Sequence, residues 1–204
     1  MMLFVPWTRP AAPTLAALLK ALARGDAAAL EALYRQEAPA VYRYALALCG
    51  DAATAADATQ EAFVALAEQP AGFDPARGAL GAYLAGIARH ALLALWRRDG
   101  REAELDDETM AALPDESGAD PEQLLARAQD LHRLWAALRA LPWPQREAVV
   151  LVDLQGRPYA EAARIAGCEL NTLRTRVLRG RQRLAAALQQ APHVPLAAGL
   201  GDAT

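Results

Sequence analysis

Hydrophobic residues recur at helical spacing along most of the chain. Leu15, Leu18, Leu19 and Leu22 follow the i, i+3, i+4, i+7 pattern, which predicts a short amphipathic helix ending near Gly25. The same periodicity predicts helices at about 27–38, 39–50, 53–67, 80–98, 124–141, 144–156, 159–166 and 171–188. The pattern therefore indicates an all-α protein.

Turn-forming residues set the expected helix ends. Asp26 is expected to cap the second helix, and Pro39 and Pro144 are each expected to open a new one, because proline is tolerated in the first turn. Residues 73–79 are rich in turn formers and predict a connector between two helices.

Charge divides the 204-residue chain more sharply than its formal net charge of −3 suggests. Residues 99–122 carry −9 and contain two prolines, which predicts a flexible acidic linker, whereas residues 127–188 carry +6. The predicted architecture is two small helical domains joined by this linker. The predicted segments are an N-terminal extension with a short helix (1–25), a helical bundle (26–98), the linker (99–126), a helix-turn-helix domain (127–189) and a flexible tail (190–204).

Several functional classes are disfavoured by what the sequence contains. Cys49 and Cys168 are isolated and expected to be buried, so neither a disulfide framework nor a zinc site is predicted, and a reducing cytoplasm fits. Residues 1–7 are apolar but too short for a signal-peptide core, and no apolar run approaches membrane-spanning length. No membrane insertion is expected.

Catalysis is not predicted either. The three histidines, His90, His132 and His193, have no ligand or triad spacing, and no Gly-rich phosphate loop is present. We therefore predict no catalytic residue, no metal and no cofactor.

The stretch 159–188 has the layout of a helix-turn-helix, with Gly167 in the turn between two helices. On the second helix, Leu173, Val177 and Gly180, with Leu184 and Leu188 beyond them, form a stripe expected to pack on the domain. The opposite face carries Thr172, Thr175, Arg176, Arg179 and Arg183, and a flank carries Arg174 and Arg181. We expect this face to enter a major groove and the flanking pair to bind phosphates. The alternative is an ordinary solvated basic helix.

Two other predicted helices have faces of interest. In 53–67, Asp57, Gln60 and Glu61 lie opposite the buried side that includes Thr59. This face is a candidate binding surface, and the alternative is an ordinary solvated carboxylate face.

In the predicted helix 80–98, polar residues recur at seven-residue intervals along an outer flank. These residues are Tyr83, His90 and Arg97. Such a strip suits a single nucleic-acid strand, since rings stack on bases and Arg binds phosphate. The alternative is unrelated surface side chains.

Ordered motifs around the linker resemble the small, two-domain extracytoplasmic-function sigma factors of bacterial RNA polymerase. Region two of that family is matched by Asp57-x-x-Gln60-Glu61-x-Phe63, Phe73-Asp-Pro-x-Arg77-Gly and Ile87-Ala-Arg89. Region four is matched by Leu141-Pro-x-x-Gln145-Arg-Glu, Tyr159-x-Glu161 and Thr172-x-Arg174-Thr175-Arg176. The likeness covers about 26–98 and 127–188.

This resemblance implies a role for each face. The face with Asp57, Gln60 and Glu61 would dock on the clamp of core RNA polymerase, the Tyr83 strip would capture the melted minus-ten strand, and the Arg176 face would read the minus-thirty-five duplex. Core polymerase, promoter DNA and an anti-sigma factor are the implied partners. The alternative function is a helix-turn-helix transcription regulator that binds duplex DNA without being a polymerase subunit.

The chain departs from the family at four places. The family usually has Asp-Ala-Glu-Asp where this chain has Thr54-Ala55-Ala56-Asp57, and Tyr83, His90 and Asn171 replace a usual Trp, Asn and Gly. Thr54 lies beside Glu61 on the predicted helix, so a phosphate there would add roughly −1.5 to −2 charges and restore lost acidity. We therefore hypothesise a phospho-switch at Thr54. The alternative is that Thr54 is a helix N-cap or a neutral surface residue.

Overall fold

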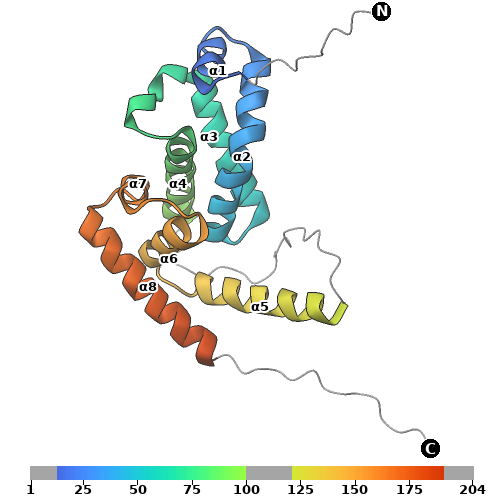
Figure 1. Cartoon of the computed structure of the whole chain (residues 1–204), viewed down its shortest axis with the longest axis vertical. Helices are drawn as coiled ribbons and strands as arrows, with labels where there is room; N and C mark the ends of the chain where they lie inside the picture. Colours follow the sequence, from blue (N-terminus) through green and yellow to red (C-terminus); the bar gives the residue numbers. More distant parts are fainter. Residues whose placement is uncertain (1–12, 100–120, 191–204) are drawn as a thin grey trace, which may run out of the picture. The chain divides into compact units, whose positions relative to one another are not determined.

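The computed structural model describes residues 13–99 and 121–190, and within these ranges every regular element is helical (Figure 1). The predicted all-α class is confirmed. The elements are α1 (Leu15–Leu22), α2 (Ala27–Cys49), α3 (Ala52–Glu68), η1 (Pro70–Gly72), η2 (Pro75–Arg77), α4 (Leu80–Asp99), α5 (Pro121–Arg139), α6 (Trp143–Val149), the π-helix η3 (Val150–Leu154), α7 (Tyr159–Ile165) and α8 (Leu170–Gln190). Most of the predicted linker, the predicted tail and residues 1–12 lie outside the described residues. No helix in the described ranges is long and apolar enough to cross a membrane.

The described chain forms two compact units. The first comprises 13–45 and 53–99, and the second comprises 46–52 and 121–190. The first unit therefore holds α1, α3, α4 and most of α2, and the second holds α5 to α8.

The first unit is a bundle in which α2, α3 and α4 lie side by side (Figure 1). Its core is built from side chains that are fully buried or nearly so: Leu33, Val41, Tyr44, Phe63, Leu66, Leu80, Leu84 and Leu92. The rings of Tyr34 and Phe63 lie 4.7 Å apart and are tilted by 56°, a geometry that contributes about 0.5–1.5 kcal/mol beyond the area buried. This contact anchors α3 on α2.

Pro39 does not open a new helix, so that prediction is wrong. It lies inside the continuous helix α2, whose start is capped as predicted, with the Ala28 amide donating to Asp26 Oδ1 at 2.9 Å. Pro39 is on the exposed side, where water can solvate the carbonyl that loses its partner. Val41 and Tyr44 beyond it are fully buried, and their packing outweighs the local cost of the proline.

The second unit is organised around α8, which contacts α5, α6 and α7. Leu173 and Val177 are buried, as predicted. Gly180 makes the close approach possible, since a Cβ at this position would lie 2.7 Å from Val149 Cγ2 and 3.1 Å from the Gln145 carbonyl oxygen. The packed stripe ends sooner than predicted, because Leu188 is 40% exposed.

The helix-turn-helix turn is present where the sequence places it. Gly167 has φ +60°, a left-handed conformation that suits glycine at the end of a helix. The Cys168 amide donates to the Ala163 carbonyl at 3.0 Å and the Gly167 amide to Arg164 at 3.3 Å, which satisfies the last carbonyls of α7. The chain can then reverse directly into α8.

Three smaller expectations need correction. Pro121 opens α5 at its first position and does not break a helix there. The helix begun at α6 widens into η3, a π-turn that periodicity does not predict. Cys49 is buried, and burial raises the pKa of its thiol to about 11, whereas Cys168 is only half-buried.

Replacing Gly180 by alanine should destabilise the protein, because neither the backbone at Gln145 nor the branched side chain of Val149 can move away cheaply. We expect a loss of about 1–3 kcal/mol in the free energy of unfolding, measured by urea denaturation. Gly86→Ala in α4 is the matched control, since its Cβ would meet nothing within 4 Å. This variant should gain up to about 1 kcal/mol from helix propensity. Equal stability of the two variants would contradict the close packing of α8 on α6.

Candidate nucleic-acid interface

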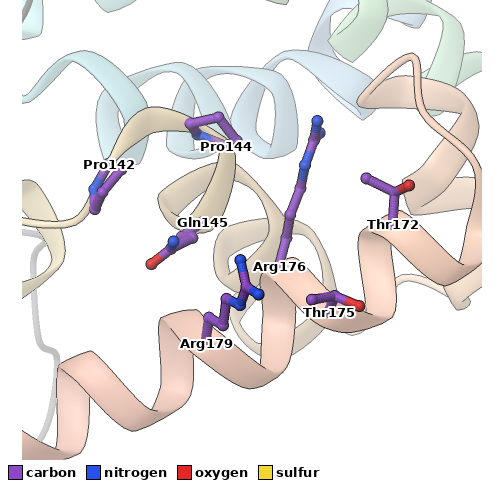
Figure 2. Close-up of a pocket in the computed structure, with 7 residues that line it drawn as sticks. All are labelled: Pro142, Pro144, Gln145, Thr172, Thr175, Arg176 and Arg179. Carbon is purple, nitrogen blue, oxygen red and sulfur yellow. The ribbon is translucent and has the colours of Figure 1, made fainter.

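A hollow of about 380 Å³ lies between the start of α6 and the polar face of α8. Its lining residues are Pro142, Pro144 and Gln145 on the α6 side and Thr172, Thr175, Arg176 and Arg179 on α8. The four α8 residues were predicted to share one face, and the structure brings them together (Figure 2). The face is set by the burial of Leu173 and Val177 on the opposite side of the helix.

The guanidinium groups give this face its charge. Figure 2 shows the Arg176 side chain extending from α8 toward the α6 side of the hollow and the Arg179 side chain directed toward Gln145. Thr175 donates its hydroxyl to the Asn171 carbonyl at 3.0 Å, which fixes that side chain. Two arginines beside two threonines can contact base edges and phosphate oxygens.

Gln145 is a member of this surface that the sequence reasoning did not assign to a site. Its Oε1 is buried and has no hydrogen-bond partner among the described residues. Its place in the Leu141-Pro-x-x-Gln145 motif was the available signal. The proximity to Arg176 and Arg179 was not readable, because it depends on how α6 packs against α8.

The side chains of the flanking pair, Arg174 and Arg181, have different partners in the structure. Arg174 is exposed and donates to Asn171 Oδ1 at 3.1 Å. Arg181 is held by Asp153 through two hydrogen bonds, Nε to Oδ2 at 3.0 Å and Nη2 to Oδ1 at 2.5 Å. These bonds and the negative charge of Asp153 raise the pKa of Arg181 above the usual value of an arginine side chain. The Arg181 guanidinium, which the sequence analysis assigned to a DNA phosphate, is therefore bound to the Asp153 carboxylate in this structure.

A second ion pair, between Arg157 and Glu161, stabilises the turn that leads into α7. Arg157 bonds to Glu161 at 2.5 Å and donates from Nε to Gln155 Oε1 at 2.7 Å, and both charged side chains are largely buried. The pair links the turn after η3 to the first turn of α7. It therefore helps to hold the helix-turn-helix in shape.

In the first unit, the outward face of α3 is as predicted. Asp57, Gln60 and Glu61 are all exposed, together with Val64, which is 46% exposed. Thr59 is buried and donates its hydroxyl to the Ala55 carbonyl at 2.7 Å, which gives the buried hydroxyl a partner within the helix.

Thr54 is half-buried and lies two residues after Ala52, where α3 begins. That place near the helix start suits either a phosphate or a neutral polar side chain. Its phosphorylation stays a prediction.

The strip on α4 is divided by exposure. His90 and Arg97 are exposed, whereas Tyr83 is half-buried, with its ring 5.5 Å from that of Phe73 at an angle of 49°. The Tyr83 hydroxyl also lies close to Gly72, where an added Cβ would come within 2.9 Å of it. The ring is thus held against the connector formed by η1 and η2, with one part left accessible.

Within residues 13–99 and 121–190, no group of three or more His, Cys, Asp or Glu side chains could hold a metal ion.

Two family models match parts of the chain. The family model for sigma-70 region 2 matches residues 33–102, and the model for sigma-70 region 4 matches residues 131–184. The first match contains α3 and α4, and the second contains α7 and most of α8.

Whole proteins show the same relationship. The chain is 37% identical over 183 residues to the ECF RNA polymerase sigma factor SigE of Mycolicibacterium smegmatis, which covers 87% of this chain and 69% of that protein. It is 33% identical over 150 residues to the ECF RNA polymerase sigma factor EcfG of Rhodopseudomonas palustris, covering 74% of this chain and 80% of that one.

Solved structures share the fold. The sigma factor RpoE of Bartonella quintana, crystallised with the anti-sigma factor NepR, is 27% identical with a TM-score of 0.64, covering 79% of this chain and 98% of that one. CnrH, solved with the cytosolic domain of CnrY, has a TM-score of 0.63 at 23% identity, covering 86% and 97%. Sigma factors are non-enzymatic initiation factors that bind DNA. The chain therefore belongs to the ECF sigma factors of RNA polymerase and recognises promoters for transcription initiation.

Proposed function

We propose that the outward face of α3 is the surface of this sigma factor that binds the clamp of core RNA polymerase. Asp57, Gln60 and Glu61 are exposed together on a helix whose other side is buried in the bundle. The exposed Val64 next to them adds an apolar contact point within the polar face. A mixed surface of this kind suits a protein interface, in which apolar contact contributes affinity and charge contributes orientation.

The strip on α4 is proposed to hold the melted promoter strand. Tyr83 presents part of a ring that Phe73 already immobilises, so stacking a base on it costs little side-chain entropy. His90 and Arg97 follow on the exposed side of the same helix and can contact bases and phosphates.

The polar face of α8 is proposed to read duplex promoter DNA. The observation that carries this is the grouping of Thr172, Thr175, Arg176 and Arg179 on one side of the second helix of a helix-turn-helix. Arg174, on the adjacent flank, is proposed to contact phosphate. The same helix in other helix-turn-helix proteins enters the major groove.

An anti-sigma factor is proposed as a further partner. The support is the pair of structural relatives, RpoE of Bartonella quintana and CnrH, each solved with a protein bound to it, NepR and CnrY respectively. The protein is proposed to act in the cytoplasm, where RNA polymerase works, without catalysis of its own.

Reversing charge on α3 tests the polymerase surface. Asp57→Lys and Glu61→Lys should each weaken co-elution of the full chain with core polymerase at least tenfold, and together abolish it, since repulsion replaces attraction at an interface. Helicity by circular dichroism should not change, because both side chains are exposed. Glu31→Lys is the matched control, an exposed acid on α2 that pairs with Arg35 one turn along the same helix. Core binding that survives the double change would remove α3 from the interface.

Arginine variants on α8 test the reading of duplex DNA. Arg176→Ala or Arg179→Ala should cost about 1–3 kcal/mol at one or two promoter positions and relax specificity there. Arg174→Ala should weaken all sequences alike, because a phosphate contact carries no sequence information. The measurement is holoenzyme binding to a panel of single-base promoter variants. Identical profiles for the Arg174 and Arg179 variants would contradict the division of the helix into two faces.

The segregated charge gives a prediction about the free protein. The −9 segment 99–122 should compete with DNA phosphates for the +6 domain, so replacing its carboxylates by Asn and Gln should raise affinity for duplex DNA and steepen the loss of affinity with salt. A variant with the same residues of 99–122 in shuffled order is the control, and it should bind like wild type. Unchanged affinity after neutralisation would show that the segment does not mask the domain.

A further inference from the structure

The Asp153 and Arg181 side chains form a contact that the proposed reading of promoter DNA by α8 does not explain. Arg181 presents two nitrogen atoms to the two carboxylate oxygens of Asp153, which lies 28 residues earlier in η3. A two-point pair of this geometry fixes direction as well as distance. Both side chains remain partly exposed, at 53% for Arg181 and 29% for Asp153.

The π-turn brings Asp153 to this position. In η3 the Gln155 amide donates to the Val150 carbonyl at 2.9 Å, five residues back, so the helix is wider here than an α-helix. A π-helical turn changes the direction of the side chains that follow it, relative to a regular α-helix. Such turns often occur at functional sites. The pair therefore depends on a local departure from α-helical geometry.

Next to the pair, Gly180 sets the separation of the two helices. A Cβ there would clash with Val149, so α8 touches the end of α6 at Gly180, and the ion pair follows at the next residue. Leu173 and Val177 hold the buried side of α8 in the domain. The bond from Arg181 to Asp153 adds a polar tie on the flank of the helix beside Gly180, and it opposes the small rotations about the helix axis that this packing still allows. Such a rotation would shift Arg176 and Arg179, which lie on the polar face of α8.

The other α8 arginines differ from Arg181. Within the part of the chain that the structure describes, α8 carries five arginines, and Arg181 is the one that a carboxylate holds. A DNA phosphate could take Arg181 only by displacing a bidentate partner already in place.

We propose that Asp153 is a positioning residue for promoter recognition: it clamps the roll of α8 through Arg181 and withholds that guanidinium from DNA phosphates. The inference rests on the proposed reading of duplex DNA by α8. The proposal has two consequences. Arg181 makes no sequence-independent contact with a DNA phosphate, and the polar face of α8 keeps a fixed orientation on the domain.

Asp153→Asn tests both halves, because it keeps the shape of the side chain and removes its charge. The released Arg181 should steepen the salt dependence of binding by about 0.9 in the slope of log K against log salt, the value of one added phosphate contact. Discrimination between a promoter duplex and its scrambled version should fall on the order of fivefold, the size typical of coupled residues in contact. Arg181→Gln should lose the same discrimination while leaving the slope unchanged.

Two controls separate the clamp from general charge effects. Glu169→Gln removes an exposed carboxylate from the residue before α8 and should leave discrimination intact. The exchange Asp153→Arg with Arg181→Asp should restore discrimination, which a merely destabilised domain would not do. The protein used is the holoenzyme, and the probe is a duplex selected from a random-sequence pool by the wild-type holoenzyme.

The outcomes are distinct. The clamp is overturned if Arg181→Gln lowers the salt slope by about 0.9 while Asp153→Asn leaves discrimination unchanged, since Arg181 would then be an ordinary phosphate contact. If the wild-type holoenzyme selects no sequence through its duplex contacts, the reading role of α8 fails, and the clamp fails with it. Loss of discrimination in both variants with rescue by the exchange establishes the clamp.

Discussion

The contact between α8 and the end of α6 determines what the second unit can do. Gly180 lets the two helices approach so closely that no side chain fits between them, and Leu173 and Val177 complete the buried side. Because one side of α8 is fixed against the domain, Thr172, Thr175, Arg176 and Arg179 are held on a common surface. The DNA-binding properties follow from this packing and not from the arginine content alone.

The two units present different chemistry to different partners. The bundle exposes carboxylates on α3, where a protein surface is the proposed partner, and an aromatic and basic strip on α4, where single-stranded DNA is the proposed partner. The helix-turn-helix unit presents arginines on α8, where duplex DNA is the proposed partner. A sigma factor needs all three contacts during initiation. Their separation on different helices means that each can be altered by mutation without disturbing the others.

Much of this could be predicted from the sequence, because it depends on local periodicity. The faces of α3 and α8 follow from the 3.6-residue repeat, and the burial of Thr59 was correctly expected on that basis. Features set by tertiary packing could not be predicted. Pro39 lies within a continuous helix because the residues after it are buried. Asp153 meets Arg181 from within a π-helix, which periodicity does not predict. Leu188 is a third example: periodicity places it on the apolar side of α8, but it does not tell where the rest of the domain stops covering that side, and Leu188 is exposed.

Transcription in a purified system tests the account most directly. The reaction combines this protein with core RNA polymerase and fragments of genomic DNA, both from the source organism. It should produce transcripts that begin at defined sites and that are absent when the protein is left out. The start sites should share sequence upstream at two separated elements, one read as duplex and one as single strand. Duplex binding by the protein alone, with no protein-dependent transcripts from core polymerase, would contradict the account and favour a regulator that acts outside the polymerase.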